Sequence, residues 1–442
     1  MATETQFSLV DRLLQLLEHL GIERSHVAGA VPSDWRNLAA AHADRLASLS
    51  LVCPPGFDPA AVASVASRTL VFHGDQGPIA ERVRTAVGRL PEVTLVTLAG
   101  YAGLVFSDVA ADRGPEVGRA LLDFARRMEQ KRPTVVRELS PCTGEVAGLS
   151  YRVQGAGPPL VLLPLTLAPS QWDPLLPHLG EHFCTITVTG PHAGIVPLLE
   201  RRGQAPGYVR LVQTLLDEVR LSRGETILDM GCGSGVVTRW LARHTGGANS
   251  ILAVDINRYL LQEARALADQ AGMQRVIRFQ EANGESLPFA DNRFDATVSV
   301  TVIEEGDADR MLAEMVRVTR PGGRVAVMVR GEDWPTQVAL PLRSELLVKA
   351  ARAMGAGAAE GGCADASLYR RVGAAGLRHV RNLPQLAIYD DPGDVMVQYY
   401  QSRALSALTP GEAEEWQAAM TEARERQAFV LAVPHHCTVG TK

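Results

Sequence analysis

The chain has 442 residues, of which 46% are hydrophobic and 21% are charged, and its formal net charge is −5. This composition is that of an ordinary globular protein, and the length allows two or three domains with cores of their own. A slight acidic excess offers no basic surface for nucleic acid or an anionic membrane, so we expect neither partner. The six cysteines are scattered without CxxC pairs, which argues against a structural zinc site, predicts no metal and fits a reducing compartment.

The N-terminal segment has apolar residues at helical spacing, including Leu9, Leu13 and Leu16, and predicts an amphipathic helix. It carries acidic residues where a signal peptide has basic ones. The most apolar stretch, residues 158–169, contains prolines and is too short for a membrane span. We therefore expect a soluble cytoplasmic protein.

Short apolar runs alternate with helical patterns along the chain, which is typical of α/β layers around parallel sheets. A first series of strands is predicted at residues 26–30, 46–54, 68–74, 93–100, 149–155, 159–164 and 184–190. A second series is predicted at residues 226–231, 250–255, 276–282, 294–300, 323–329 and 429–434. Between the two series, residues 192–207 have the glycine, proline and charge content of a connector. We expect two α/β domains, residues 1–195 and 207–442, with residues 196–206 as the linker.

Two segments of the first predicted domain, residues 8–52 and residues 148–194, carry a family resemblance. The first resembles the stretch around the nucleophile of an α/β-hydrolase, and the second resembles the beginning of the same fold, so its parts are in an unusual order. The resemblance implies a circularly permuted domain in which residues 1–130 are the later part of the fold and residues 146–194 the earlier part. It also implies that the strand at 160–164 pairs in parallel with the strand at 26–30. This pairing can form within one chain or across a domain-swapped homodimer.

The catalytic residues of such hydrolases are missing at the corresponding positions. The nucleophile position holds Val31, the triad acid falls on Gly77, and the triad histidine falls on Gly103. Ser33 and Tyr101 are substitutes without a base or an orienting partner at the family positions. We therefore predict that this domain is not catalytic.

The segment ILDMGCGSG, residues 227–235, is a predicted strand that ends in three glycines before a helical pattern. Glycines permit tight turns and a close approach of the backbone to a ligand. The next predicted strand ends in Asp255, whose carboxylate can accept hydrogen bonds from both hydroxyls of a ribose. Val236 stands where a dinucleotide site has its third glycine, which disfavours NAD. The pattern predicts a nucleoside site.

Four motifs in the correct order over residues 205–330 resemble class I S-adenosyl-L-methionine (SAM) methyltransferases of the ubiquinone and menaquinone biosynthesis type. They are ILDMGCGSG, SILAVD, FQEANGESLPFADNRFDATVSV and EMVRVTRPGGRVAV. The resemblance implies a Rossmann-like sheet, SAM as the cofactor, and a cofactor site formed by Asp229, Gly231, Gly233, Gly235, Asp255 and Asn283. Asn283 stands where the family usually has an aspartate that binds the adenine amino group, and its amide oxygen can still accept. Leu287 and Phe289 pack either around the adenine or in the core.

The end of the fourth strand, TVIEEGD, faces the methyl group in this family. Glu305 is the leading candidate for a general base, although related sequences often have a histidine there, and its alternative is a solvated acid at a helix start. His435 and His436 are the second candidates if the last predicted strand closes the sheet, and their alternative is an exposed or hydrogen-bonded side chain. The tyrosines in the C-terminal region either line an acceptor pocket or pack at the edge of the core, namely Tyr369, Tyr389, Tyr399 and Tyr400.

The sequence thus predicts a SAM-dependent methyltransferase that methylates oxygen or carbon of a small organic acceptor in specialised or quinone-like metabolism. Its hydrolase-like part is expected to be non-catalytic. The alternative is a non-catalytic SAM-binding scaffold or regulatory protein, which the departures at Asn283 and Glu305 favour and the intact glycine loop disfavours. A hydrolase with an unrelated nucleophile is the third hypothesis.

Overall fold

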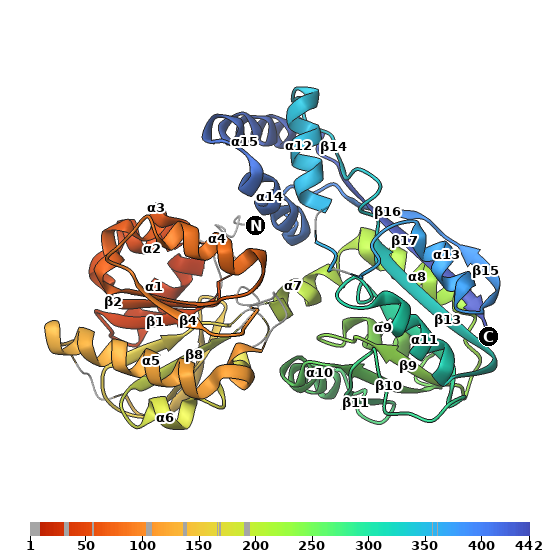
Figure 1. The fold of residues 1–442 in the computed structure, drawn as a ribbon, viewed down its shortest axis with the longest axis horizontal. Coiled ribbons are helices and arrows are strands. Elements are labelled where there is room, and N and C mark those ends of the chain that lie inside the picture. Colours follow the sequence, from red (N-terminus) through yellow and green to blue (C-terminus); the bar gives the residue numbers. More distant parts are fainter. Residues whose placement is uncertain are drawn as a thin grey trace. The chain divides into compact units, whose positions relative to one another are not determined.

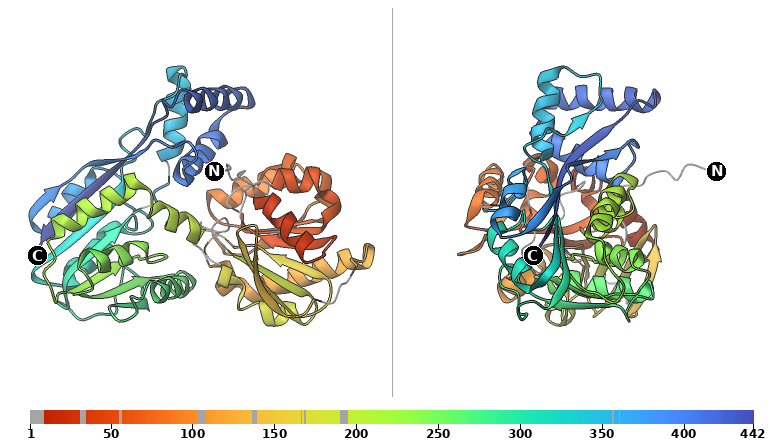
Figure 2. Two further views of the ribbon diagram at one scale, coloured as in Figure 1. Left: turned by 180° about the vertical axis from the view of Figure 1, so that it is seen from behind. Right: turned by 90° about the vertical axis from the view of Figure 1, so that its right-hand side faces the viewer.

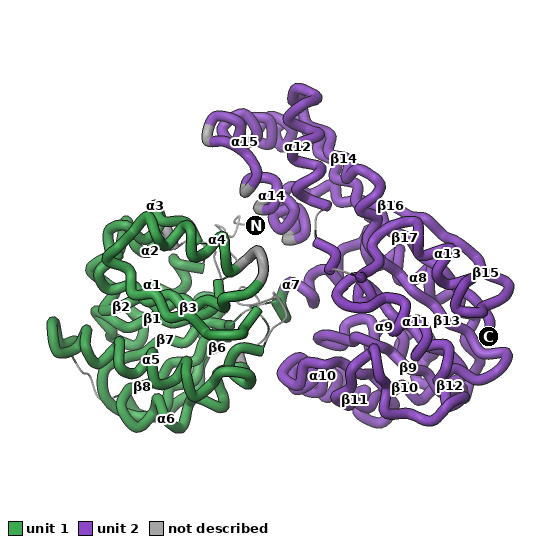
Figure 3. The backbone as a smooth tube through the Cα atoms, in the orientation of Figure 1, with its two compact units in different colours: residues 1–197 green, residues 198–442 purple. Residues whose placement is uncertain are grey.

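The structure is a computed structural model. It describes residues 9–30, 35–54, 57–102, 108–135, 139–165, 167, 169–189, 195–355, 357–359 and 361–442. The chain divides into two compact units, residues 1–197 and residues 198–442 (Figure 3). Each unit has its own β-sheet and its own hydrophobic clusters.

The described residues of the first unit form an eight-stranded sheet in the order β4-β3-β2-β1-β7-β8-β6-β5 (Figure 1). The strands are β1 (Ser25–Gly29), β2 (Leu46–Val52), β3 (Thr69–Gly74), β4 (Thr94–Leu98), β5 (Cys142–Val146), β6 (Leu149–Gln154), β7 (Pro159–Leu162) and β8 (Cys184–Thr189). The six strands β4, β3, β2, β1, β7 and β8 follow one another in the sheet and are parallel to each other. β6 is antiparallel to both β8 and β5. β5 was not predicted from the sequence.

The predicted parallel pairing of the strand at 160–164 with the strand at 26–30 is confirmed. β1 pairs with β7 in the register His26 to Leu160, Val27 to Val161 and Ala28 to Leu162. Both strands belong to the same chain, so the sheet is continuous from β4 to β5 without a second molecule.

Helices pack on both faces of this sheet. The first face is covered by α1 (Leu9–His19), α2 (Trp35–Ala41), α3 (Pro59–Val62) and α4 (Gly77–Val87). The opposite face is covered by α5 (Val109–Lys131) and α6 (Leu176–Gly180). Because successive residues of a strand point to opposite faces, Val27 packs in the first cluster and Ala28 in the second. The strands buried on both faces explain the nearly continuous apolar runs in the sequence.

A buried polar network ties α5 to the sheet near the amino ends of β1 and β2. His26 Nδ1 lies 2.8 Å from Ser48 Oγ, and His26 Nε2 lies 3.0 Å from Glu129 Oε1. Glu129 Oε2 accepts from the backbone N–H of Thr134 at 2.9 Å. His26 and Ser48 are each only 1% exposed, so this serine is closed to substrates. The network is a buried polar contact between α5 and the sheet.

The second unit contains a nine-stranded sheet within the part that the structure describes, in the order β11-β10-β9-β12-β13-β17-β14, with β15 and β16 also paired to β17. The strands are β9 (Thr226–Met230), β10 (Ser250–Asp255), β11 (Ile277–Glu281), β12 (Phe294–Val300), β13 (Thr319–Arg330), β14 (Gln337–Val338), β15 (Arg378–Asn382), β16 (Gln385–Tyr389) and β17 (Leu431–Thr441). β17, which carries the two C-terminal histidines, is antiparallel to β13 and lies beside it, and β14, β15 and β16 pair with β17 as well.

The helix α7 (Ile195–Arg202) crosses the boundary between the two units. The helices described after it are α8 (Pro206–Val219), α9 (Val236–His244), α10 (Arg258–Gln270), α11 (Ala308–Val318), α12 (Ser344–Gly355), α13 (Ser367–Ala374), α14 (Val395–Ala407) and α15 (Pro410–Glu425). Residues that we predicted as an irregular linker therefore form most of α7. In Figures 1 and 2, α12, α14 and α15 gather beyond the end of the sheet where β13 terminates. Among the described residues, no helix combines the length and the apolar character that crossing a bilayer demands.

The Glu129 network predicts a pH-dependent contribution to stability. Burial alone raises the pKa of Glu129, but hydrogen bonds from His26 and Thr134 outweigh it and hold the pKa below its ordinary value of 4.5. A carboxyl group with a lowered folded-state pKa stabilises the fold above the unfolded-state pKa and loses this effect as the pH falls.

We expect Glu129→Gln to lower the free energy of local unfolding of α5 and β1 by about 1–2 kcal/mol at pH 7. The difference in this free energy between the variant and the wild type should become smaller below pH 4.5. Hydrogen exchange of the amides in the full chain measures this quantity. The matched control is Glu116→Gln, an exposed position on the same helix. An equal effect of both substitutions would contradict the claim that the hydrogen bonds of Glu129 stabilise this unit.

Candidate functional site

The three predicted glycines form a tight loop between β9 and α9. Gly231, Gly233 and Gly235 have φ angles of +77°, +54° and +76°, a region that side-chain-bearing residues rarely adopt. A Cβ on Gly231 would collide with Val302 in the segment after β12. The backbone N–H groups of Gly231 and Cys232 both donate to Val254 O, at 2.8 and 2.9 Å. The loop is therefore held against the ends of β10 and β12.

Asp255 is the residue that fixes this loop. Its Oδ2 accepts from the backbone N–H of Gly233 at 2.8 Å, and its Oδ1 accepts from the backbone N–H of Asn257 at 2.8 Å. Burial raises the pKa of Asp255, and these hydrogen bonds act in the opposite direction. Each carboxylate oxygen has a second lone pair, so two acceptor positions remain for a ligand with two neighbouring hydroxyls.

Asp229 lies at the end of β9 and is 1% exposed. Thr238 Oγ1 of α9 donates to its Oδ2 at 2.5 Å. The pKa of Asp229 is raised to about 6. Burial is the largest cause, the hydrogen bond from Thr238 acts in the opposite direction, and the charge of Asp255 adds to the rise. Two acidic groups thus stand close to the glycine loop, which gives this end of the sheet a negative potential suited to a cationic ligand.

The surroundings of Asp255 offer one apolar surface and one polar group. Ile256 follows Asp255 and is 64% exposed, which is unusual for isoleucine. Asn283 is exposed and its Oδ1 accepts from the backbone N–H of Glu285 at 2.9 Å. Leu287 and Phe289 are 5% and 6% exposed and pack in the core with Met230 and Val254. Of the two alternatives for Leu287 and Phe289, the structure favours core packing.

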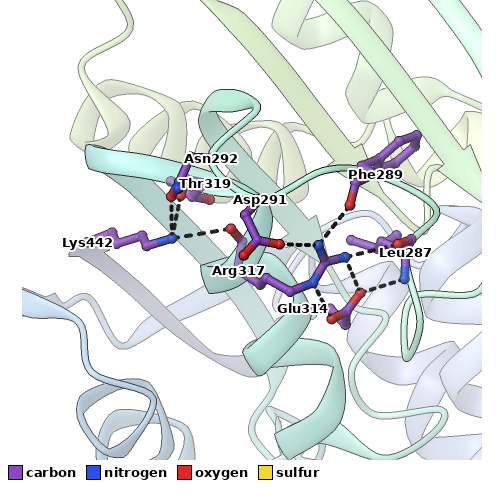
Figure 4. A network of polar contacts seen from close by, with 8 residues as sticks. All are labelled: Leu287, Phe289, Asp291, Asn292, Glu314, Arg317, Thr319 and Lys442. Atoms are coloured by element: carbon purple, nitrogen blue, oxygen red, sulfur yellow. Dashed lines mark hydrogen bonds and ion pairs between the residues drawn. The ribbon is translucent and has the colours of Figure 1, made fainter.

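A network around Arg317 holds the segment after Asn283 in place (Figure 4). Arg317 Nη1 donates to Phe289 O and to Asp291 Oδ1, both at 2.7 Å, and Nη2 donates to Leu287 O at 3.0 Å. Glu314 Oε2 accepts from the backbone N–H of Leu287 at 2.6 Å. Lys442 extends the network by donating to Thr319 O and to Asn292 Oδ1. These contacts fix the position of the loop that follows Asn283.

The helix α7 is attached to the glycine loop by Glu200. Ser234 Oγ donates to Glu200 Oε1 at 2.6 Å, and Arg239 pairs with Glu200 Oε2. Arg239 Nη1 also donates to Ser234 O at 2.9 Å. A Cβ on Gly203, just after α7, would collide with Val236. The chain before β9 therefore packs tightly on the loop, which sequence analysis did not predict.

The two glutamates after β12 occupy different environments. Glu304 is 1% exposed and its carboxylate accepts from both the backbone N–H and Nε of Arg330. The side chain of Glu305 is 34% exposed, and one of its oxygens lies 3.4 Å from Arg330 Nη2. The pKa of Glu305 is raised to about 7. Burial is the largest cause, the charge of Arg330 acts in the opposite direction, and the charge of Glu304 adds to the rise. Glu304 thus has a structural role, while Glu305 can bind and release a proton near neutral pH.

His435 and His436 are neighbours on β17 and therefore point to opposite faces of the sheet. His436 Nε2 donates to Asp333 Oδ1 and its Nδ1 lies against Tyr369 Oη, both at 2.7 Å. His435 Nδ1 donates to Val433 O at 3.1 Å. Burial, together with the charges of Arg202 and Arg330, lowers the pKa of His435 to about 4. His436 has both nitrogens engaged, whereas His435 is neutral and keeps Nε2 as an acceptor.

The tyrosines do not form one pocket wall. Tyr369 belongs to the His436 network, while Tyr389 and Tyr400 are 3% and 6% exposed and pack with α8 in the main core cluster. Arg403 of α14 donates to Tyr399 Oη at 3.1 Å. A buried tyrosine that sequence analysis overlooked, Tyr208 of α8, belongs to the same cluster as Tyr389 and Tyr400.

The structure describes only part of the hydrolase-like positions in the first unit. Val31, Ser33 and Gly103 lie outside the described residues. Gly77 is the first residue of α4, and Tyr101 Oη donates to Asp112 Oδ2 at 3.3 Å. Across the described ranges, no group of histidine, cysteine and acidic residues is arranged to hold a metal ion.

Comparison with known proteins finds relatives of part of the second unit. The sequence model of a family described as "Methyltransferase domain" matches residues 227–323. Methyltransferase GfsG from Streptomyces halstedii is 36% identical over 126 residues, which are 28% of this chain and 45% of that protein. Ubiquinone/menaquinone biosynthesis C-methyltransferase UbiE from Escherichia coli O1:K1 is 36% identical over 107 residues, or 24% of this chain and 43% of that protein. The chain thus spans less than half of the length of these relatives, and the match to a methyltransferase domain is confined to residues 227–323.

Solved structures also resemble part of the chain. Geranyl diphosphate C-methyltransferase from Streptomyces coelicolor A3(2) is 17% identical with a TM-score of 0.33, over 53% of this chain and 78% of that one. The YcgJ protein from Bacillus subtilis is 18% identical with a TM-score of 0.35, over 53% of this chain and 98% of that one.

Proposed function

We propose that this protein transfers the methyl group of SAM to oxygen or carbon of a small organic acceptor, in specialised or quinone-like metabolism. The observation that carries the proposal is the hydrogen bond between Gly233 and Asp255 within a domain that matches a methyltransferase family. This contact brings a glycine loop and a ribose-binding carboxylate together at the carboxyl ends of adjacent parallel strands, where α/β folds bind nucleosides.

The residues present fit SAM. Asp255 keeps an acceptor position on each oxygen for the two ribose hydroxyls, and the exposed side chain of Ile256 offers an apolar surface to the adenine ring. Asn283 has a second lone pair on its amide oxygen for the adenine amino group. Asp229 and the loop of Gly231, Gly233 and Gly235 hold the methionine end. The cofactor supplies an electrophilic methyl group on a positively charged sulfur.

The chain contributes mainly alignment and control of the acceptor proton. Glu305 is the best candidate for the base, because its pKa of about 7 leaves much of it ionised at neutral pH. His435, with a pKa of about 4, is a weaker proton acceptor, and both nitrogens of His436 are already hydrogen-bonded. Arg330 lies between Glu304 and Glu305 and orients the latter.

The first unit is proposed to be a non-catalytic, circularly permuted α/β-hydrolase-like domain, spanning the region before α7. Its support is the parallel pairing of β1 with β7, which the permuted order requires. Gly77 at the expected position of the acid and the closed environment of Ser48 also argue against hydrolysis. Since the sheet is complete in one chain, a domain-swapped homodimer is not needed to build it.

Incubation of the full chain with methyl-labelled SAM and a small-molecule cell extract tests the proposal. We expect label to appear in a small organic product. Tight binding of SAM without any transfer of label would favour the alternative, a SAM-binding scaffold or regulatory protein.

Asp255→Ala should weaken SAM binding by about 2 kcal/mol, because charge-assisted hydrogen bonds to the ribose are lost. The substitution also frees the N–H of Gly233, and Asp255→Asn, which retains one acceptor oxygen, should have a smaller effect. Titration calorimetry measures the affinity, and Asp269→Ala on the exposed face of α10 is the control. If Asp255→Ala bound SAM with the affinity of the wild type, Asp255 would not belong to the cofactor site.

Glu305→Gln should lower turnover by about 10²-fold to 10⁴-fold while SAM affinity is retained, since a positioned base contributes on that scale. Wild-type turnover should rise as the pH increases through about 7, where the carboxyl group loses its proton, and this limb should vanish in the variant. Asp309→Asn, an exposed acid of α11, is the control. Turnover equal to wild type, with methyl transfer rate-limiting, would contradict the role of Glu305.

A further inference from the structure

Thr301, the first residue after β12, has a backbone conformation that threonine rarely adopts. Its φ angle is +55°, in the left-handed region. Because threonine is branched at Cβ, this conformation is strained, whereas glycine would adopt it without strain. The other non-glycine residues with a positive φ in the described ranges are not branched at Cβ, namely Cys53, Ala147, Arg220, Asn292, His379 and Gln427. Strain of this kind persists only where surrounding contacts impose it, and it is concentrated at functional sites.

Contacts with three parts of the second unit impose this conformation. The backbone N–H of Thr301 donates to Met328 O of β13 at 2.7 Å. The next residue, Val302, lies so close to the glycine loop that a Cβ on Gly231 would be 2.3 Å from Val302 Cγ2. Burial raises the pKa of Tyr208 on α8, and a side-chain hydrogen bond with Thr301 acts in the opposite direction. Thr301 is therefore fastened to β13 and α8, and its neighbour to the glycine loop.

The segment that begins at Thr301 leads directly to Glu305. The backbone N–H of Glu305 donates to Val302 O at 2.9 Å, which closes a turn immediately after Thr301. Glu304, within this turn, accepts from Arg330 Nε at 2.7 Å. Since the segment is rigidly held from Val302 onward, the conformation of Thr301 sets the direction in which it leaves β12 and hence the place of Glu305.

We propose that Thr301 is a positioning residue of the methyl transfer, whose strained turn and side chain hold the segment with Glu305 in place beside the glycine loop. This inference rests on the proposed function, in which Glu305 accepts the proton of the acceptor. A misplaced base loses much of its effect, because proton transfer depends on alignment. Glycine would form the same turn without strain but also without the contact to Tyr208, so the strain of Thr301 is explained if that contact keeps the segment in place.

The test measures the initial rate at which the full chain transfers label from methyl-labelled SAM into a small-molecule cell extract, together with the midpoint of thermal unfolding. We expect Thr301→Gly to be slower by at least about fivefold, with a midpoint no lower than that of the wild type because strain is released. Thr301→Ser, which retains the hydroxyl, should keep at least about half of the wild-type rate. The matched control is Gln427→Gly, an exposed position with φ of +52°, which should leave the rate unchanged. A wild-type rate in Thr301→Gly, a lower midpoint in that variant, or an equal loss in Thr301→Ser would overturn the inference.

A double-mutant cycle tests whether Thr301 acts through Glu305. In the Glu305→Gln background, Thr301→Gly should change the rate by less than about twofold, since no base remains to be positioned. The same fivefold loss in both backgrounds would overturn the inference.

A third measurement separates this role from cofactor binding. Calorimetry should give Thr301→Gly the affinity of the wild type for S-adenosylhomocysteine, and a loss of about tenfold or more would assign Thr301 to the cofactor site and overturn the inference. Absence of label transfer by the wild-type chain would instead contradict the proposed function.

Discussion

The hydrogen bond from the backbone N–H of Gly233 to Asp255 Oδ2 is the contact on which the site depends. It joins the loop after β9 to the end of β10, and it requires the left-handed conformation that the loop glycines adopt. The same carboxylate holds the N–H of Asn257 and so fixes the start of α10. The shape of the loop, the start of α10 and the proposed recognition of a ribose are therefore linked through one side chain.

Contacts from distant parts of the chain reinforce this arrangement. Glu200 fastens α7 to Ser234 and Arg239, and Val302 after β12 packs against Gly231 so closely that no Cβ fits there. After β12, Arg330 forms a close ion pair with the buried Glu304 and a longer one with the partly exposed Glu305. Glu304 and Arg330 therefore have a structural role, whereas Glu305 is the residue proposed to accept a proton.

The positions of most strands could be predicted from the sequence, because strands that are buried on both faces produce long apolar runs. The pairing of β1 with β7 followed from the resemblance, not from any local pattern. β15 was missed because its residues, Arg378–Asn382, are polar and half-exposed at the sheet edge. Glu200 was missed because it lies in a segment that looked like a connector, and its partners Ser234 and Arg239 are 34 and 39 residues away in the sequence. Alternation along β17 does predict opposite faces for His435 and His436, but only a structure identifies what each face contacts.

A crystal structure of the full chain with S-adenosylhomocysteine tests the central claim most directly. The account predicts the nucleoside on the loop of residues 231–235, with both ribose hydroxyls within about 3.2 Å of the carboxylate of Asp255. A nucleoside bound elsewhere, or no bound nucleoside at saturating concentration, would contradict it.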